Sequence, residues 1–148
     1  MAKLTFQRNN GVIILTSRDH KILGVWRSHN RTSTGHQPWP DGTWAYDSYN
    51  PHPELSGPST VCDCWSGSGL PTDTAGLGCF GIHLFRVRGR SGLGIHAGRT
   101  PAPPAGNLVS LGGKTLGCIR VPPDAMLKIN QIHFGGDRIK EITVELGK

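Results

Sequence analysis

Apolar and polar positions alternate through the first fifty residues, which is the pattern of half-buried β-strands. Asn10 and Gly11 separate the first two runs, and an Asn-Gly pair is a strong hairpin signal. The predicted segments are KLTF (3–6), VIILTS (12–17), ILGVWRS (22–28) and TWAYDSY (43–49). Short polar turns join the first three, so we expect a β-meander, with a Gly- and Pro-rich loop before the fourth.

The second half of the chain predicts more strands and one helix. Extended segments are expected at CFGIHLFRVRG (79–89), SGLGIHAG (91–98), NLVSLGG (107–113) and DRIKEITVEL (137–146). Residues 122–134, PPDAMLKINQIHF, are expected to form the helix, because proline suits a first turn and Asp124 suits the positive end of the helix dipole. Met126, Ile129 and His133 would share one face.

Composition supports a single loop-rich domain that is mainly β. The 148 residues include 21 glycines and 11 prolines, with 36% hydrophobic residues. A chain of this length buries close to two-thirds of its unfolded surface, so residues 1–148 are predicted to be one domain. Residues 50–78 carry few apolar anchors, and two readings stay open: a lid beside a site, or a disordered insertion.

The formal charge of +6 is scattered, since no run of Lys and Arg exceeds two residues. This distribution does not predict nucleic-acid binding. No segment approaches the roughly 20 apolar residues of a membrane span, so no membrane insertion is expected. The first residues lack the pattern of a signal peptide, which predicts synthesis in the cytoplasm.

Four cysteines occur, at Cys62, Cys64, Cys79 and Cys118. A Cys-x-Cys pair is too close for an easy internal disulfide and lacks the common zinc spacing. A disulfide between Cys79 and Cys62 or Cys64 stays open. So do a metal site on these three cysteines and a histidine, and a metal or redox site built on VCDCW (61–65). Overall, no metal is expected.

Cys118 has one histidine in a suggestive position. A thiol nucleophile needs a neighbouring base, and His96 ends a predicted strand in a Gly-flanked turn 22 residues earlier. Two strands that end side by side would bring the two side chains together. His83 alternates with apolar neighbours and is compatible with facing solvent, while His133 near a helix end suits charge compensation. Polar loops predict solvated side chains for the others: His20, His29, His36 and His52.

GIHAGR (94–99) followed by TLGCIR (115–120) resembles the signature of L,D-transpeptidases, the YkuD-type catalytic domain of cell-wall enzymes. PWPDGTW (38–44) is similar to an upstream element of that family, so the resemblance spans roughly residues 38–122. Two positions depart from the pattern. Leu116 stands where most members have a second histidine, and Ala97 replaces the common Gly or Ser.

The resemblance implies a single YkuD-like β-sandwich or barrel with one short helix after the catalytic loop. It implies Cys118 as the nucleophile and His96 as the general base, and it requires no cofactor. Gly117 would let the backbone turn so that amide groups face an oxyanion, with Thr115 bonding within the loop. Arg120 and Arg99 are candidates to bind a substrate carboxylate.

The implied chemistry is acyl transfer on peptidoglycan tetrapeptide stems, with L,D-carboxypeptidase, L,D-transpeptidase or D-amino acid exchange as outcomes. The looser motif and the missing signal-peptide pattern resemble the divergent relatives that bacteria inject into competitors through type VI secretion. This resemblance implies an antibacterial toxin that acts in the periplasm or cell wall, with an immunity protein as a partner. The alternative is a catalytically inactive module of the same fold that binds cell wall or protein, which Leu116 favours.

Overall fold

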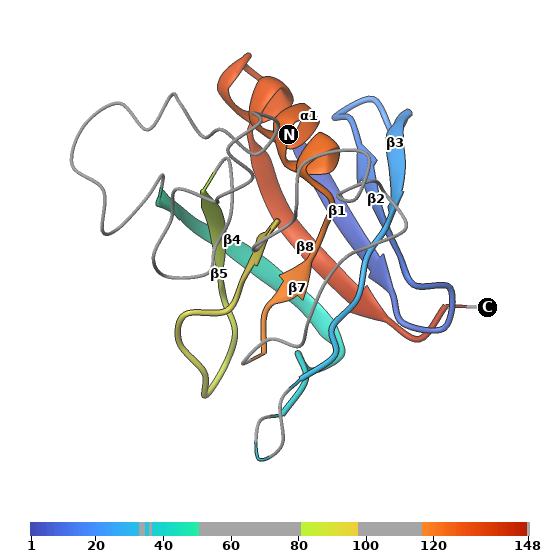
Figure 1. The fold of residues 1–148 in the computed structure, drawn as a ribbon. Coiled ribbons are helices and arrows are strands. Elements are labelled where there is room, and N and C mark those ends of the chain that lie inside the picture. Colours follow the sequence, from blue (N-terminus) through green and yellow to red (C-terminus); the bar gives the residue numbers. More distant parts are fainter. Residues whose placement is uncertain (33–34, 36, 51–80, 98–116, 148) are drawn as a thin grey trace, which may run out of the picture.

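The computed structural model describes residues 1–32, 35, 37–50, 81–97 and 117–147 (Figure 1). Eight strands and one helix occur in this part of the chain. They are β1 (Ala2–Gln7), β2 (Val12–Thr16), β3 (Ile22–Arg27), β4 (Gly42–Asn50), β5 (Ile82–Arg86), β6 (Gly94–His96), β7 (Ile119–Arg120), α1 (Pro123–Phe134) and β8 (Ile139–Glu145). The mainly β prediction and the helix are confirmed. The expected extended piece at 107–113 lies outside the described residues.

All eight strands form one sheet in the order β3-β2-β1-β8-β4-β5-β6-β7. The first three strands form the expected antiparallel meander. The expectation that the fourth strand continues it is wrong, because β8 lies between β1 and β4. Ile142 and Val144 of β8 are buried, and a central position in the sheet gives this strand a hydrogen-bonded neighbour on both sides.

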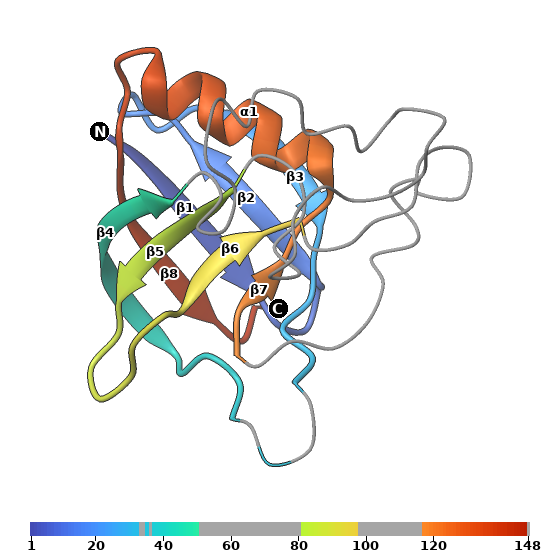
Figure 2. The ribbon, with the colours of Figure 1, turned by 60° about the vertical axis from the view of Figure 1, so that its left-hand side comes forward.

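The sheet curls so that β7, the strand at one edge, meets the residues that follow β3, the strand at the other edge. β7 pairs with β6 in parallel. On its other side, His29 N–H donates to the Arg120 carbonyl (3.1 Å) and Arg120 N–H donates to the His29 carbonyl (2.8 Å). These two bonds join β7 to the segment that follows β3, so the sheet is a half-barrel whose lateral gap is bridged at this point (Figure 2).

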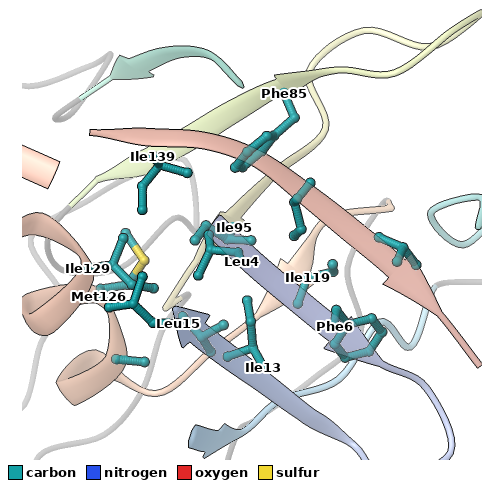
Figure 3. Close-up of a cluster of buried hydrophobic side chains, with 14 of the residues drawn as sticks. Leu4, Phe6, Ile13, Leu15, Phe85, Ile95, Ile119, Met126, Ile129 and Ile139 are labelled. Atoms are coloured by element: carbon teal, nitrogen blue, oxygen red, sulfur yellow. The ribbon is translucent and has the colours of Figure 1, made fainter. Parts of the chain in front are cut away.

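Alternate side chains of the strands fill the interior of the half-barrel (Figure 3). Leu4, Ile13, Ile95 and Ile119 are fully buried there. Helix α1 covers one end and adds its own apolar side chains (Figure 2). Pro122 and Pro123 start it, Asp124 lies in the first turn, and the side chains of Met126, Ile129 and His133 are buried.

No helix within the described ranges is long and apolar enough to cross a membrane.

Candidate active site

The parallel pairing of β6 with β7 sets the geometry of the candidate site. Ile95 lies opposite Ile119, and both point into the core. Because side chains alternate along a strand, His96 and Cys118 lie on the other face of the sheet. Cys118 precedes β7 and is two residues out of register with His96, so standard strand spacing puts their Cα atoms about 8 Å apart.

The thiol of Cys118 lies beside backbone atoms at the start of β6. Gly94 lies level with Cys118 on the neighbouring strand. Sγ of Cys118 lies 3.5 Å from the carbonyl oxygen of Gly92, to which the thiol donates. The cysteine itself is half-buried. The thiol therefore lies against the backbone of the turn and strand that lead into β6.

Burial raises the pKa of the Cys118 thiol above its usual value. A hydrogen bond from the backbone of Gly94 and the positive charge of Arg90 act in the opposite direction but do not overcome the burial. The resting cysteine is thus a thiol near neutral pH. It needs a base to become a nucleophile.

Gly117 has a φ of 137°, in the region that favours glycine. A Cβ atom at this position would also lie 2.5 Å from Nη2 of Arg90 and 2.8 Å from Cδ2 of Leu93. Two separate features therefore require glycine at position 117, which was predicted to allow a sharp turn before the cysteine. One is its backbone angle, and the other is the close approach of two side chains.

Asn30 holds the backbone around the cysteine. Its Nδ2 donates to the carbonyl oxygens of Gly117 (2.7 Å) and Cys118 (2.9 Å). Its Oδ1 accepts from the N–H of Trp39 (2.6 Å). One side chain thus ties the start of β7 to the loop before β4. Sequence reasoning missed Asn30, since nothing in its polar loop distinguishes it from its neighbours.

Arg90 fixes the same loop from the β5–β6 turn. Its Nη1 donates to the carbonyl of Pro38 (2.7 Å) and its Nη2 to that of Gln37 (2.9 Å). Trp39 then inserts into the core, where its ring packs on Phe85 at a centroid distance of 5.8 Å. The start of PWPDGTW therefore packs beside the cysteine strand. Arg90 was also missed, because the two carbonyls that it binds lie more than 50 positions away in the chain.

Arg120 is buried, and its guanidinium bonds to the backbone of the neighbouring strand. Its Nε and Nη2 donate to the carbonyl of Ala97 at 3.2 and 3.1 Å. This contact joins β7 to the end of β6, two residues along the strand from Cys118. A role of Arg120 in binding a substrate carboxylate stays a prediction.

The remaining predicted site residues, Thr115 and Arg99, lie outside the described residues, as does Leu116. The same holds for the three other cysteines and the disulfide or metal site left open for them. It also holds, from residue 51 onward, for the segment 50–78 interpreted as a lid or a disordered insertion. Within the ranges that the structure describes, no group of three or more His, Cys, Asp or Glu side chains could hold a metal ion.

Three histidines differ from expectation, and all three are buried. His83 is fully buried and bonds to Tyr46 and Asn130, so the solvent-facing interpretation is wrong. His29 belongs to the bridge to β7 rather than to a solvated loop. His133 accepts a hydrogen bond from the Ile139 N–H at 3.0 Å, and burial lowers its pKa, so it is a neutral acceptor. Only tertiary contacts explain these positions.

Comparisons with known proteins rest on structure, since no family model matches the chain and no curated protein matches its sequence. An L,D-transpeptidase from Stackebrandtia nassauensis superposes with a TM-score of 0.52 at 14% identity, over 97% of this chain and 54% of that one. L,D-transpeptidase 1 from Mycobacterium tuberculosis gives 0.52 at 14%, over 97% and 61%. Bd1075 from Bdellovibrio bacteriovorus gives 0.57 at 13%, over 99% and 48%.

This chain spans about half to three-fifths of the length of those proteins. At such low sequence identity the likeness concerns the fold. The curled, mainly β sheet with its single described helix is the L,D-transpeptidase fold.

Proposed function

We propose that this protein is a cysteine acyltransferase that acts on peptidoglycan tetrapeptide stems. The observation that supports the proposal is the parallel pairing of β6 with β7, which sets His96 and Cys118 on one face of a sheet with the L,D-transpeptidase fold. A thiol whose pKa is raised by burial also requires the base that this arrangement offers.

In the first half-reaction, His96 takes the proton of the Cys118 thiol while Sγ attacks the carbonyl carbon of meso-diaminopimelate. Backbone N–H groups of Gly117 and Cys118 are the proposed donors to the oxyanion, with Thr115 supporting the loop. When the tetrahedral intermediate collapses, the C–N bond breaks and the imidazolium returns its proton to the departing D-Ala nitrogen. The product is a thioester on Cys118.

In the second half-reaction, His96 removes a proton from the acceptor, which attacks the thioester and restores the thiol. Water gives an L,D-carboxypeptidase, a stem amine gives a cross-link, and a free D-amino acid gives exchange. Arg99 and Arg120 stay candidates to bind substrate. Delivery of the protein into a competitor's periplasm by type VI secretion, and an immunity protein that would block it, belong to this proposal as predictions.

A second candidate function is an inactive binding module of the same fold. The raised pKa of Cys118 favours it, because a protonated and half-buried thiol is a poor nucleophile unless a base reaches it.

Incubation with purified muropeptides, followed by mass spectrometry, tests both functions. We expect loss of one Ala mass, dimers or a swapped terminal residue, according to the acceptor. Cys118→Ala and His96→Asn should abolish turnover, whereas Cys79→Ala is the matched cysteine control and should retain it. If Cys118→Ala turned over substrate as fast as wild type, the proposal of a cysteine acyltransferase would be wrong. Binding of muropeptides without turnover by wild type would support the binding module.

A further inference from the structure

A small cavity of about 220 Å³ lies between the hairpin of β1 and β2 and the segment that follows β3. Phe6, Arg8 and Gly11 line it from the hairpin, and residues 28–31 line it from the other side. Sites for drug-sized ligands usually enclose roughly 300–1,000 Å³. This cavity therefore suits an ion or a small organic group rather than a peptide. Its wall includes neither residue of the candidate catalytic pair.

Ser28 contributes a buried hydroxyl to the wall of this cavity. The residue is only 4% exposed, and its N–H donates to the carbonyl of Gly11 at 2.8 Å. Its Oγ has no hydrogen-bond partner among the residues that the structure describes. Burial of a hydroxyl without a partner is unfavourable, because the group loses its hydrogen bonds to water. An acceptor atom inside the cavity would satisfy this hydroxyl.

Two arginines give the wall an excess of positive charge. Nε of Arg8 donates to Oδ1 of Asp41 at 2.8 Å, so Asp41 offsets the charge of Arg8. Arg31 is exposed and forms no ion pair with any residue of the described ranges. None of the described residues that line the cavity is an aspartate or a glutamate. The cavity therefore favours an anion.

The acceptor atoms of the neighbouring side chains, which would repel an anion, are already bonded. Oδ1 of Asn30 accepts from the N–H of Trp39 at 2.6 Å. Nδ1 of His29 accepts from the N–H of Arg31 at 3.2 Å, so a neutral His29 carries its proton on Nε2. The same bond holds the short turn that carries Arg31. The polar part of the wall is thus biased toward donors, which selects a ligand with several acceptor atoms.

We propose that this cavity binds a phosphate group, with Ser28, Arg8 and Arg31 as its donors. A phosphate monoester presents three strong acceptor oxygens, so it can accept from a hydroxyl and from a guanidinium at the same time. A guanidinium also bonds two phosphate oxygens in parallel. A carboxylate has only two oxygens in one plane and would reach fewer of these donors. The inference does not depend on the proposed acyl transfer.

Thermal unfolding without and with phosphate tests the role of Ser28. In phosphate-free buffer, Ser28→Ala should be at least as stable as wild type, because the change removes a buried hydroxyl that has no partner. Phosphate, added at constant ionic strength, should raise the Tm of wild type and raise that of Ser28→Ala less. Ser48→Ala removes an exposed hydroxyl outside the cavity and should respond to phosphate as wild type does.

Affinity is measured by NMR titration of backbone amide shifts with inorganic phosphate, glycerol 3-phosphate and acetate, again at constant ionic strength. We expect Ser28→Ala and Arg31→Gln each to weaken binding of phosphate about tenfold. Arg18→Gln, in the turn between β2 and β3, removes an exposed charge elsewhere and should bind as wild type does. Cys118→Ala should also bind as wild type does. Tighter binding of glycerol 3-phosphate would identify a phosphate monoester as the ligand, and tighter binding of inorganic phosphate would identify the free ion.

Three results would overturn the inference. The first is that neither phosphate probe gives saturable binding, and the second is that acetate binds as tightly as phosphate. The third is an unchanged affinity in Ser28→Ala or in Arg31→Gln. Loss of phosphate binding in Cys118→Ala would overturn it as well, because the site would then lie at the candidate nucleophile.

Discussion

Nδ2 of Asn30 donates to the carbonyl oxygen of Cys118 at 2.9 Å, which couples a loop residue to the backbone of the candidate nucleophile. The same amide group donates to Gly117 and the other end of the side chain accepts from Trp39. Because a peptide group is planar, holding both carbonyls fixes the directions of the N–H groups that follow them. Asn30 is thus a positioning residue for the turn before β7.

Replacing Asn30 with Ala should lower both stability and the reactivity of Cys118. The change leaves two carbonyls and one N–H without this partner, and we expect a loss of about 1–3 kcal/mol in the free energy of unfolding. Urea denaturation measures that loss. The rate of Cys118 alkylation in the folded protein, followed by mass spectrometry of its peptide, should change as well.

Asn9→Ala is the control for this substitution, since Asn9 is exposed and its backbone N–H donates to the carbonyl of Leu146. It should leave both measurements unchanged. A positioning role for Asn30 fails if Asn30→Ala loses stability but alkylates Cys118 at the wild-type rate under native conditions.

Gly117→Ala should be more damaging than an alanine at another glycine of positive φ. The new Cβ would meet Arg90 and Leu93, and a non-glycine residue at a φ of 137° is strained by about 1–3 kcal/mol before any contact is counted. Gly89 has a φ of 76° with nothing within 4 Å of its Cβ position. Gly89→Ala should therefore lower the free energy of unfolding only by the cost of its backbone conformation, about 1–2 kcal/mol.

Thermal unfolding of the two variants gives the comparison. Equal stabilities would mean that the approach of Arg90 and Leu93 to Gly117 is not rigid. The same pair should differ in chemistry, with slower alkylation of Cys118 in Gly117→Ala and wild-type alkylation in Gly89→Ala.

Local signals predicted the strands and the helix because each depends on nearby residues. The Asn10-Gly11 turn, the alternation in β8 and the two prolines at the start of α1 all act over a few positions. The place of β8 between β1 and β4 depends instead on which strands bury one another's side chains, which no local pattern encodes. The cysteine strand β7 has only two residues and is too short to give a periodic signal.

The candidate site divides in the same way. His96 and Cys118 could be predicted from their motifs. The residues that bond to the backbone around Cys118, or place a positive charge near it, come from distant segments. Asn30 lies 88 positions from Cys118 in the chain, and the carbonyls bound by Arg90 lie more than 50 positions from it. Burial of His83 is likewise a property of the closed half-barrel and not of its own strand.

Arg90→Gln should raise the pKa of Cys118 further. The positive charge of Arg90 favours the thiolate and partly offsets the effect of burial, so its removal leaves burial less opposed. The midpoint of the pH profile for Cys118 alkylation should move to higher pH, and the rate at pH 8 should fall several-fold. Arg90→Lys keeps the charge and is expected to retain more of the rate. An unchanged midpoint in Arg90→Gln would show that the charge does not act on the thiol.

The buried His83 should make stability depend on pH. Its Nε2 lies 2.6 Å from Oδ1 of Asn130, an oxygen that only accepts, so Nε2 carries the proton and Nδ1 accepts from the Tyr46 hydroxyl at 2.8 Å. This neutral arrangement uses both ring nitrogens. Burial lowers the pKa of His83 from 6.5 to about 4. Between pH 4 and 6.5, His83 is therefore mostly neutral in the folded protein and mostly protonated in the unfolded chain.

Stability should fall with falling pH, because the unfolded state takes up a proton on His83 between pH 6.5 and 4 and the folded state does not. The free energy of unfolding should be full above pH 6.5, fall as the pH drops toward 4, and level off below it, with a total loss of roughly 3 kcal/mol from this histidine. Urea denaturation between pH 7.5 and 4 measures the slope. His83→Gln keeps a donor for Asn130 but does not titrate, so it should be less stable at pH 7.5 and show a shallower slope. Because carboxyl groups titrate equally in both proteins, equal slopes would exclude His83 as the cause.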